Sequence, residues 1–178
     1  WWQTNAGGRL QLRDVRRFGR IAVVDAGDYR SMPTLHHLGP EPFDADLSPE
    51  VFWASLKSTN RHVKTALLSQ RPIAGVGNIY ADEACWLAQV SPLRRRVTRA
   101  QASALLDAIR EVLAAAIANG GTTLRDYRTA DGGQGENQFH LSCYGRSGEP
   151  CVRCGTALTS RSVDARTTTW CPNCQPNR

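Results

Sequence analysis

Hydrophobic and polar positions alternate in the first part of the chain, residues 8–25. The alternation runs from Arg9 to Val15, and a second apolar stretch follows Gly19. This pattern favours two strands joined around residues 16–19. Two strands do not form an independent sheet, so they need partners. The chain also starts with two tryptophans and no methionine. We therefore expect the start of a larger domain to be missing.

Residues 32–47 follow as a predicted linker. Prolines at positions 33, 40, 42 and 49 exclude continuous regular structure there. The order Ser48-Pro49-Glu50 is typical of an N-cap, a first helical residue and a first-turn acid. It predicts a helix from Pro49 to about Thr59.

Helical periodicity then dominates up to about residue 121. One helix is predicted over 61–70, a break over 71–77, and a second helix from Asn78 to about Ala88. Thr98 and Gln101 have capping-box spacing and open a long third helix. Its apolar positions form one stripe, which we interpret as core: Ala102, Leu105, Leu106, Ile109, Val112, Leu113, Ala116 and Ile117. Asn119-Gly120-Gly121 ends this helix.

The last piece, residues 132–178, is too small and polar to build a good core, so it needs a covalent or metal cross-link. The candidate for this cross-link is a pair of C-x-x-C motifs separated by 16 residues: Cys151, Cys154, Cys171 and Cys174. This spacing is typical of a structural zinc site with four thiolate ligands. Disulfides and a redox pair are the alternatives, and no βαβ context favours a redox site. Cys85 and Cys143 lie outside the motif, and we expect buried thiols there.

The composition describes a basic globular chain. It has 178 residues, a formal net charge of +6 and 41% hydrophobic residues. No run approaches the roughly 18 apolar residues of a membrane span, so we expect no membrane association. Lys57 and Lys64 are the only lysines, and the other basic residues are arginines. Basic ends and a basic middle flank residues 21–60, which hold two basic and six acidic residues. This distribution fits a polyanion-binding protein, with an ordinary solvated surface as the alternative.

A glycine-rich turn, Gly75-Val76-Gly77-Asn78, separates the first two helices of the middle region. Glycines allow a tight turn and a close approach to a ligand. With Asn78 as the N-cap of the next helix, free backbone N–H groups could cradle a phosphate. Lys64 could reach the same anion. A plain helix–helix turn is the alternative.

Six segments of the chain resemble, in order, the bacterial formamidopyrimidine-DNA glycosylases. These segments are residues 14–19, 38–42, 64–83, 120–127, 144–151 and 166–175. The resemblance implies an α+β architecture: the remnant of a β-sandwich domain over 1–31, the linker over 32–47, a helix–two-turns–helix DNA-binding domain over 48–131, and a lesion loop with a zinc-ribbon β-hairpin over 132–178. Residues 120–127 resemble the oxidised-purine branch of the family more than the oxidised-pyrimidine branch.

The resemblance also implies roles for individual residues. Phosphates beside the flipped-out nucleotide would be bound through Lys64, the Gly75–Gly77 turn, Asn78, Tyr144 and Arg166. Arg16 would read the orphaned base, while Phe18 would wedge into the stack. Backbone N–H groups of Leu124, Arg125, Asp126 and Tyr127 would face the lesion. One structural zinc ion would be held by the four cysteines of the two C-x-x-C motifs.

The implied activity is that of a bifunctional DNA glycosylase and AP lyase of base excision repair, acting on 8-oxoguanine and formamidopyrimidines. Family members attack the sugar with an N-terminal proline, followed by a glutamate and assisted by a lysine. This sequence begins at Trp1, and its first proline is Pro33. We therefore expect no catalytic residue in this chain and no activity from it alone. Residues 132–139 also lack the aromatic residue that family members often carry after the second glycine, which leaves the lesion preference open.

The expected partner is double-stranded DNA containing oxidised bases. The protein is expected to be a monomer in the bacterial cytoplasm, associated with the nucleoid. A naturally truncated, non-catalytic binder of damaged or bent DNA is one alternative. A zinc-ribbon module that binds RNA or the ribosome is another. It would explain the cysteines and the charge but not the Gly75–Asn78 turn.

Overall fold

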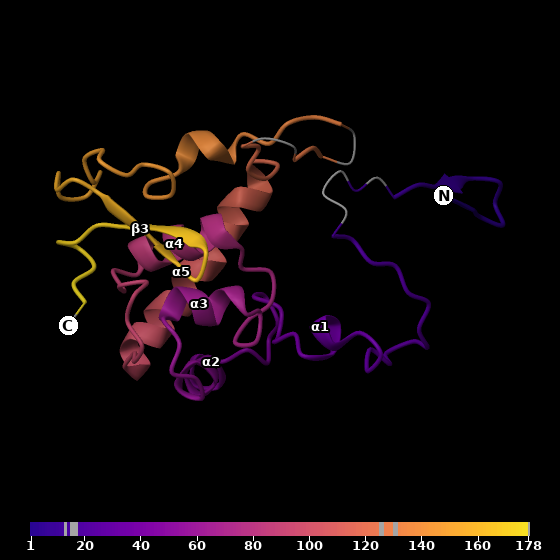
Figure 1. Ribbon diagram of the computed structural model, residues 1–178, viewed down its shortest axis with the longest axis horizontal. Coiled ribbons are helices and arrows are strands. Elements are labelled where there is room, and N and C mark those ends of the chain that lie inside the picture. Colours follow the sequence, from indigo (N-terminus) through magenta and orange to yellow (C-terminus); the bar gives the residue numbers. More distant parts are fainter. Residues whose placement is uncertain (13, 15–17, 125–126, 130–131, 178) are drawn as a thin grey trace. The chain divides into compact units, whose positions relative to one another are not determined.

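The computed structural model describes residues 1–12, 14, 18–124, 127–129 and 132–177 (Figure 1). It has an α+β architecture and divides into two units, Trp1–His36 and His37–Arg178. The division falls inside the range predicted as a linker. Each unit has its own local structure.

The first unit contains little regular structure. Strands β1 (Trp2–Gln3) and β2 (Arg9–Leu10) form an antiparallel pair, and α1 (Pro33–His36) is a single helical turn. The predicted strand after Gly19 is not formed, since residues 18–25 adopt no strand. Strands of only two residues include few of the backbone N–H and C=O groups of a segment in hydrogen bonds between strands. The large apolar side chains of this unit are exposed: Trp1, Trp2, Leu10, Leu12, Phe18, Ile21 and Val23.

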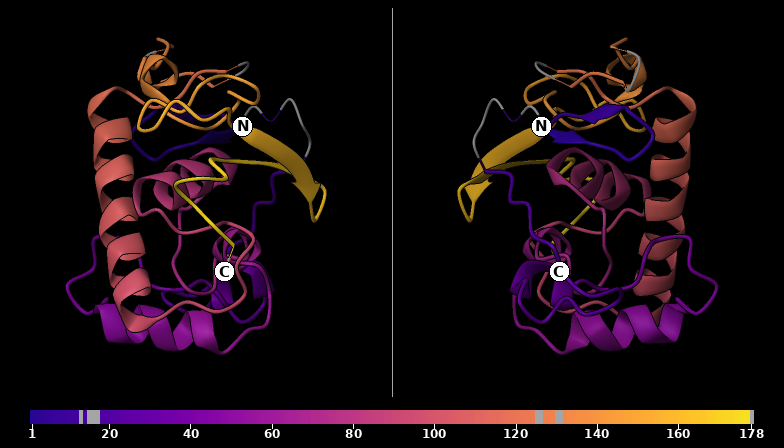
Figure 2. Two further views of the ribbon diagram at one scale, coloured as in Figure 1. Left: turned by 90° about the vertical axis from the view of Figure 1, so that its left-hand side faces the viewer. Right: turned by 90° about the vertical axis from the view of Figure 1, so that its right-hand side faces the viewer.

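Among the described residues, four α-helices build the second unit: α2 (Pro49–Lys57), α3 (Val63–Leu68), α4 (Asn78–Leu87) and α5 (Arg99–Ala118). The predicted N-cap of α2 is confirmed, because the Val51 amide donates to Ser48 Oγ at 3.3 Å. The predicted capping box of α5 is present in full. Figure 2 shows α2 lying across the N-terminal part of α5. Among the described residues, no helix combines the length and the apolar character that crossing a membrane requires.

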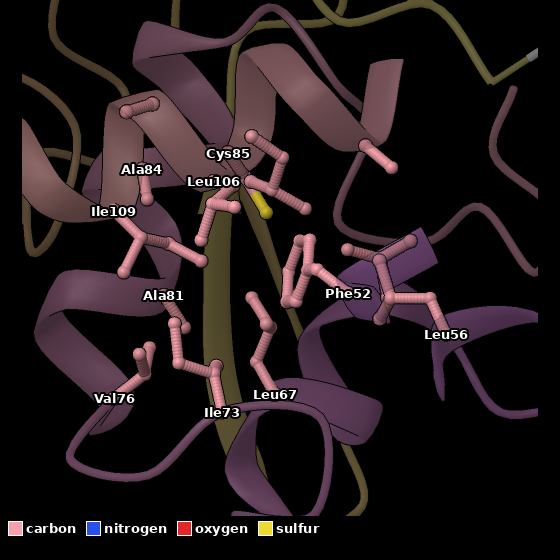
Figure 3. Packing of buried hydrophobic residues seen from close by; sticks show 14 of the residues in the cluster. Phe52, Leu56, Leu67, Ile73, Val76, Ala81, Ala84, Cys85, Leu106 and Ile109 are labelled. Atoms are coloured by element: carbon pink, nitrogen blue, oxygen red, sulfur yellow. The ribbon is translucent and has the colours of Figure 1, made fainter. Parts of the chain in front are cut away.

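These helices enclose a hydrophobic core, called the helical core below. Phe52 of α2, Leu67 of α3 and Leu106 of α5 meet at its centre (Figure 3). Its other large members are Leu47, Leu56, Val63, Ile73, Val76, Val90, Leu105 and Ile109. The predicted stripe of α5 is buried up to Ile109 and again at Ala116, while Val112 and Leu113 are partly buried against the core. Ile117 is wrong as a core residue, because its side chain is 70% exposed at the last turn of the helix.

The second half of the predicted linker belongs to the helical unit. Gly39 N–H donates to Gln70 O at 2.7 Å, and Ala74 N–H donates to Pro40 O at 2.9 Å. A Cβ atom on Gly39 would lie 2.3 Å from the Arg71 carbonyl oxygen, so only glycine fits there. The Arg110 side chain of α5 also donates to Pro42 O and Leu47 O, each at 2.8 Å. Backbone hydrogen bonds and the half-buried Arg110 side chain therefore hold this segment in place, although its prolines suggested flexibility.

The C-terminal part contains the short 3₁₀ helix η1 (Asn137–His140) and a hairpin of β3 (Thr159–Val163) and β4 (Arg166–Trp170). Asp164 and Ala165 form its two-residue turn with φ angles of 48° and 60°. Positive φ at both positions is typical of the type I′ turn that matches strand twist.

A second, smaller group of buried residues lies beside the hairpin: Trp86, Cys143, Cys151, Leu158 and Cys171. It is called the cysteine cluster below. Gln175 is fully buried beside it. Its side chain donates to Val90 O at 3.0 Å and accepts from Cys171 N–H at 2.8 Å. The end of the chain is therefore tied into the helical unit.

Candidate nucleic-acid interface and metal centre

The glycine turn before α4 is held by a side chain that the sequence did not single out. Gln70 Oε1 accepts from Gly75 N–H, and Gln70 Nε2 donates to Val76 O, both at 2.7 Å. Gly75 has a φ of 77°, which the absence of a side chain permits. Asn78 is the first residue of α4 and Gly77 its N-cap, so the predicted N-cap role of Asn78 is wrong. The Asn78 side chain is thereby left available to other partners.

Asn78 and Arg166 come together although they are far apart in the sequence. Both line one surface hollow of about 450 Å³, together with Gly77 and Thr65. Asn78 Nδ2 lies 3.5 Å from the Tyr144 hydroxyl, at the limit of a hydrogen bond. Arg166 is exposed at the start of β4, and no ion pair to it occurs among the described residues. Amide, hydroxyl and guanidinium donors therefore converge from three segments.

Lys64 does not face this hollow. Its side chain is 1% exposed, and Nζ lies 2.7 Å from Asp82 Oδ1 and 2.7 Å from Thr167 O. Two of the three N–H donors of the ammonium are thus directed to protein groups. The phosphate contact of Lys64 stays a prediction. The ammonium connects α3, α4 and the hairpin.

Two neighbouring carboxylates on α4 hold the segments that carry the donors. Asp82 Oδ2 accepts from Thr169 N–H of β4 at 3.0 Å. Burial raises the pKa of Asp82 to about 6, against the opposing effects of Lys64 and the Thr169 amide. Glu83 accepts from the backbone N–H groups of residues 142, 143 and 144 at 2.9, 2.8 and 2.7 Å. Asp82 therefore positions the hairpin of Arg166, and Glu83 positions Tyr144.

Sequence reasoning missed Asp82 and Glu83, although a signal was present. Both acids stand in the middle of a helix whose neighbouring residues, Ala81, Ala84 and Cys85, are small or apolar. Charged residues at such positions are rarely fully buried unless they are paired. Their partners lie 18 to 87 residues away in the chain, so no local pattern reveals them.

The predicted lesion loop is described only in part. Leu124 and Tyr127 are exposed, while Arg125 and Asp126 lie outside the described residues. The base of the loop is fixed, because Thr123 N–H donates to Gln138 Oε1 and Gly135 N–H donates to Thr123 Oγ1, both at 2.9 Å. The contact of this loop with a lesion stays a prediction.

The two residues predicted to enter the DNA stack belong to the first unit. Phe18 is 77% exposed there, and Arg16 lies outside the described residues. The wedge and base-reading roles of these residues stay predictions.

The four cysteines of the C-x-x-C motifs lie close together, and two of them, Cys151 and Cys171, also belong to the cysteine cluster. Their Sγ atoms all lie within 4.8 Å of one another. A tetrahedral zinc site with Zn–S bonds of about 2.3 Å separates its sulfurs by about 3.8 Å, so these residues fit such a metal. Trp86 Nε1 lies 3.4 Å from Cys151 Sγ, and Cys174 N–H lies 3.4 Å from Cys171 Sγ. Donors aimed at sulfur are typical of the surroundings of thiolates.

The four thiols of the two C-x-x-C motifs differ in their electrostatics. Side-chain hydrogen bonds from Thr156 and Asn173 lower the pKa of Cys154 to about 5, whereas burial raises the pKa of Cys174 to about 12. Four thiolates at this separation repel one another, and a coordinated cation keeps such thiols deprotonated. The cluster can therefore hold one divalent metal ion in a closed, four-sulfur site. Cys85 and Cys143 are buried thiols outside this site, as predicted.

Two protein-family models match the chain. The formamidopyrimidine-DNA glycosylase H2TH domain matches residues 38–128. The zinc finger found in FPG and IleRS matches residues 148–177, which include all four clustered cysteines. The first match spans the glycine turn and Asp82–Glu83. The second spans the hairpin and Arg166.

Known relatives and structures agree with these matches. A formamidopyrimidine-DNA glycosylase of Deinococcus radiodurans is 44% identical over 99% of this chain and 64% of its own length. The crystal structure of the MutM (Fpg) protein from Thermus thermophilus is 47% identical, with a TM-score of 0.86 over 93% of this chain and 64% of that one. A Lactococcus lactis FPG mutant in complex with a Fapy-dG containing DNA is 35% identical, with a TM-score of 0.74 over 82% and 55%. The chain thus spans less than two thirds of these relatives.

Proposed function

Because the chain belongs to the formamidopyrimidine-DNA glycosylase family, we propose that it is the damaged-DNA-binding portion of a bifunctional DNA glycosylase and AP lyase. The observation that carries this proposal is the convergence of Asn78, Tyr144 and Arg166 on one side of the helical unit. These residues come from the glycine turn, the 142–144 loop and the hairpin. The three segments are joined by Lys64, Asp82 and Glu83.

The three donors suit a phosphate of the DNA backbone. A guanidinium forms charge-assisted hydrogen bonds with phosphate oxygens, and amide and hydroxyl groups add neutral ones. The start of α4 also presents unpaired backbone N–H groups and the positive end of the helix dipole. Flipping a nucleotide out of the duplex costs a few kcal/mol, which firm contacts to the neighbouring phosphates help to offset.

We propose oxidised purines, 8-oxoguanine and formamidopyrimidines, in double-stranded DNA as the substrates of the whole protein. The name of the Deinococcus relative and the Fapy-dG DNA in the Lactococcus complex support this choice. The predicted similarity of residues 120–127 to the oxidised-purine branch supports it too. We further propose that the protein acts as a monomer in the bacterial cytoplasm, associated with the nucleoid.

The four clustered cysteines would hold one structural zinc ion. A closed four-thiolate site leaves no open position for a substrate or water, so it contributes shape and not chemistry. Cys154 precedes and Cys171 follows the β3–β4 hairpin. The metal would thereby fix the two ends of the hairpin whose tip carries Arg166.

DNA binding by the metal-loaded chain tests this proposal. We expect Arg166→Ala to weaken binding to a duplex with one 8-oxoguanine and to flatten the salt dependence of log Kobs by about 0.9, the effect of one lost phosphate contact. Arg99→Ala is the matched control, because Arg99 lies over the Trp53 ring, away from the hollow. Fluorescence anisotropy at several salt concentrations measures both. Equal slopes for the two variants would argue against the phosphate contact.

Catalysis is expected to require residues that this chain does not contain. Borohydride trapping on 8-oxoguanine DNA captures the Schiff base of the family's lyase reaction. We expect no covalent adduct, and an adduct with this chain would overturn the binding-only role. Reading the genomic DNA upstream of the Trp1 codon separates a piece of an enzyme from a naturally truncated binder. An in-frame Met-Pro-Glu start supports the enzyme, and a stop codon supports the binder.

A further inference from the structure

A second hollow, of about 680 Å³, lies next to the Asn78–Arg166 hollow. Its walls come from the α2–α3 connection, the α4–α5 connection and strand β3. The side chains that matter are Arg61, His62, Thr65, Arg95, Arg161 and Asp164. We call it the arginine hollow. Its residues were not among the predicted site residues.

The arginine hollow carries an excess of positive charge. It combines three guanidiniums with one carboxylate, Asp164, which already accepts the Thr65 hydroxyl at 2.5 Å. Within the part of the chain that the structure describes, no ion pair to Arg61, Arg95 or Arg161 occurs. Like charges gathered in one concavity raise the local concentration of anions. The hollow is therefore suited to an anionic ligand.

One of the guanidiniums is held in place before any ligand arrives. Arg95 Nη1 donates to Asn60 O at 2.6 Å, and Arg95 Nη2 lies 3.4 Å from His62 Nε2. His62 Nδ1 lies 2.5 Å from Leu93 O, and because a carbonyl only accepts, Nδ1 must carry the proton. Nε2 of the neutral ring is then an acceptor for Arg95. Arg95 uses two of its five N–H donors in this way and keeps three for a ligand.

A second guanidinium lies near an aromatic ring. The Arg161 guanidinium lies 6.0 Å from the centre of the Trp170 ring on the paired strand, at the outer limit of a cation–π contact. Such a contact uses none of the hydrogen-bond donors of the guanidinium. Arg161 therefore also enters the hollow with free donors.

The two hollows adjoin each other, since Arg61, Thr65 and Asp164 line both. Each strand of B-DNA carries one phosphate per about 3.4 Å of helix axis. A strand that places a phosphate at Asn78 and Arg166 can therefore present a further phosphate to the arginine hollow.

We propose that Arg95 and Arg161, with Arg61 between the hollows, form a second phosphate site that binds the DNA backbone flanking the lesion. This inference rests on the proposed DNA-binding function. The ligand class is a phosphodiester of duplex DNA. Free inorganic phosphate shares that chemistry and is the alternative source.

The test measures the salt dependence of DNA binding by the metal-loaded full chain with two 8-oxoguanine duplexes. One duplex is long on both sides of the lesion, and the other ends just beyond the lesion. We expect Arg95→Gln and Arg161→Gln each to reduce the slope of log Kobs against log salt by about 0.9 on the long duplex. On the short duplex we expect no change. The loss should be the same for damaged and undamaged long duplexes, because a phosphate contact carries no base information.

Arg96→Gln is the matched control. It removes the same charge from the same loop, is exposed, and does not line the arginine hollow. If Arg95→Gln and Arg161→Gln change the long-duplex slope no more than Arg96→Gln does, the second phosphate site is overturned. The circular dichroism spectrum of each variant and its thermal unfolding curve, compared with those of the unmodified chain, verify that the fold is retained. Since Arg95 and Arg161 lie on different elements, loss of folding in one variant leaves the other as the test.

Two further outcomes separate the remaining interpretations. In the first, the unmodified chain binds inorganic phosphate, and Arg95→Gln abolishes that binding without changing the salt slope of DNA binding. This result would assign the hollow to a free anion and overturn the proposal. Failure of the proposed function has a different signature, namely an Arg166→Ala variant that binds both duplexes like the unmodified chain.

Discussion

The helical core and the cysteine cluster lie on opposite faces of α4, yet they are held together in different ways. Ala81, Ala84 and Cys85 point into the helical core among large aliphatic and aromatic side chains. Asp82, Glu83 and Trp86 are directed to the cysteine side. The first region depends on buried apolar area. The second has five buried residues, three of them cysteines, and depends on thiolate chemistry and buried hydrogen bonds.

This difference explains which side chains of the molecule are fixed in position and orientation. Apolar packing is non-directional, whereas an ion pair or a carboxylate with three N–H donors fixes position and orientation. The groups proposed to bind DNA, Tyr144 and Arg166, are attached to the side that uses directional contacts. The helical core supplies the rigid base from which Asp82 and Glu83 reach them.

Removal of the metal is expected to separate the two regions most clearly. Structural zinc sites contribute about 10–16 kcal/mol of apparent binding energy, which is folding energy for the segment that holds them. A chelator should therefore remove the amide-exchange protection of residues 148–177 while much of the helical circular dichroism of α2–α5 persists. Added zinc should restore the protection. Simultaneous loss of protection in α5 and in the hairpin would show that the two regions fold as one unit.

Loss of the carboxylate of Asp82 is expected to have the next largest effect. Asp82→Asn leaves the buried Lys64 ammonium without a counter-ion, which typically costs about 3–5 kcal/mol of unfolding free energy. Urea denaturation measures this, and the exposed Asp107→Asn on α5 is the matched control. A Lys64→Met/Asp82→Asn double variant should recover part of the loss. If it recovers nothing, the ion pair is not the source of the effect.

A cavity in the helical core tests the apolar side of the comparison. Leu106 is fully buried, and Leu106→Ala should lower the unfolding free energy by about 2–5 kcal/mol. Ile117→Ala, on the same helix but 70% exposed, should change it by less than about 0.5 kcal/mol. The thiolate absorption of the cobalt-substituted protein should be the same in both variants. A changed cobalt spectrum in Leu106→Ala would mean that the core also shapes the metal site.

The hairpin turn offers the smallest effect, and it is stabilising. Ala165 has a φ of 60°, a conformation that costs a residue with a side chain about 1–2 kcal/mol. Glycine relieves this strain but loses more chain entropy, so Ala165→Gly should raise the unfolding free energy by about 0.5–1 kcal/mol. Asp164→Gly should not stabilise, because it removes the acceptor of the Thr65 hydroxyl. Thermal unfolding of the metal-loaded protein measures both, and a destabilised Ala165→Gly would contradict the strain.

Local signals predicted the elements of the helical unit well. The Ser48 cap, the Thr98–Gln101 box and the glycines after α5 act within a few residues of the helix ends that they determine. The cysteine spacing likewise brings its residues together through two short turns. The fold class, the helices and the metal-binding cluster could therefore be predicted from the sequence.

Contacts between distant segments could not be predicted in the same way. Lys64 looked like a surface cation because its partners, Asp82 and Thr167, are 18 and 103 residues further along the chain. The arginine hollow was missed for the same reason, since Arg95 and Arg161 meet only when the hairpin folds against the helices. The strand expected after Gly19 shows the opposite case, in which a local apolar stretch does not produce a strand without neighbouring strands.

The buried position of Gln175 has a consequence for the order of events during synthesis. A ribosome releases the chain from its N-terminus, so α2–α5 can pack while the segment that contains Gln175 is still inside the exit tunnel. The carbonyl of Val90 gains its hydrogen bond from the Gln175 side chain, which is synthesised 85 residues later. The amide of Cys171 also donates to that side chain. Assembly of the Arg166 hairpin therefore finishes only after Gln175 has left the exit tunnel.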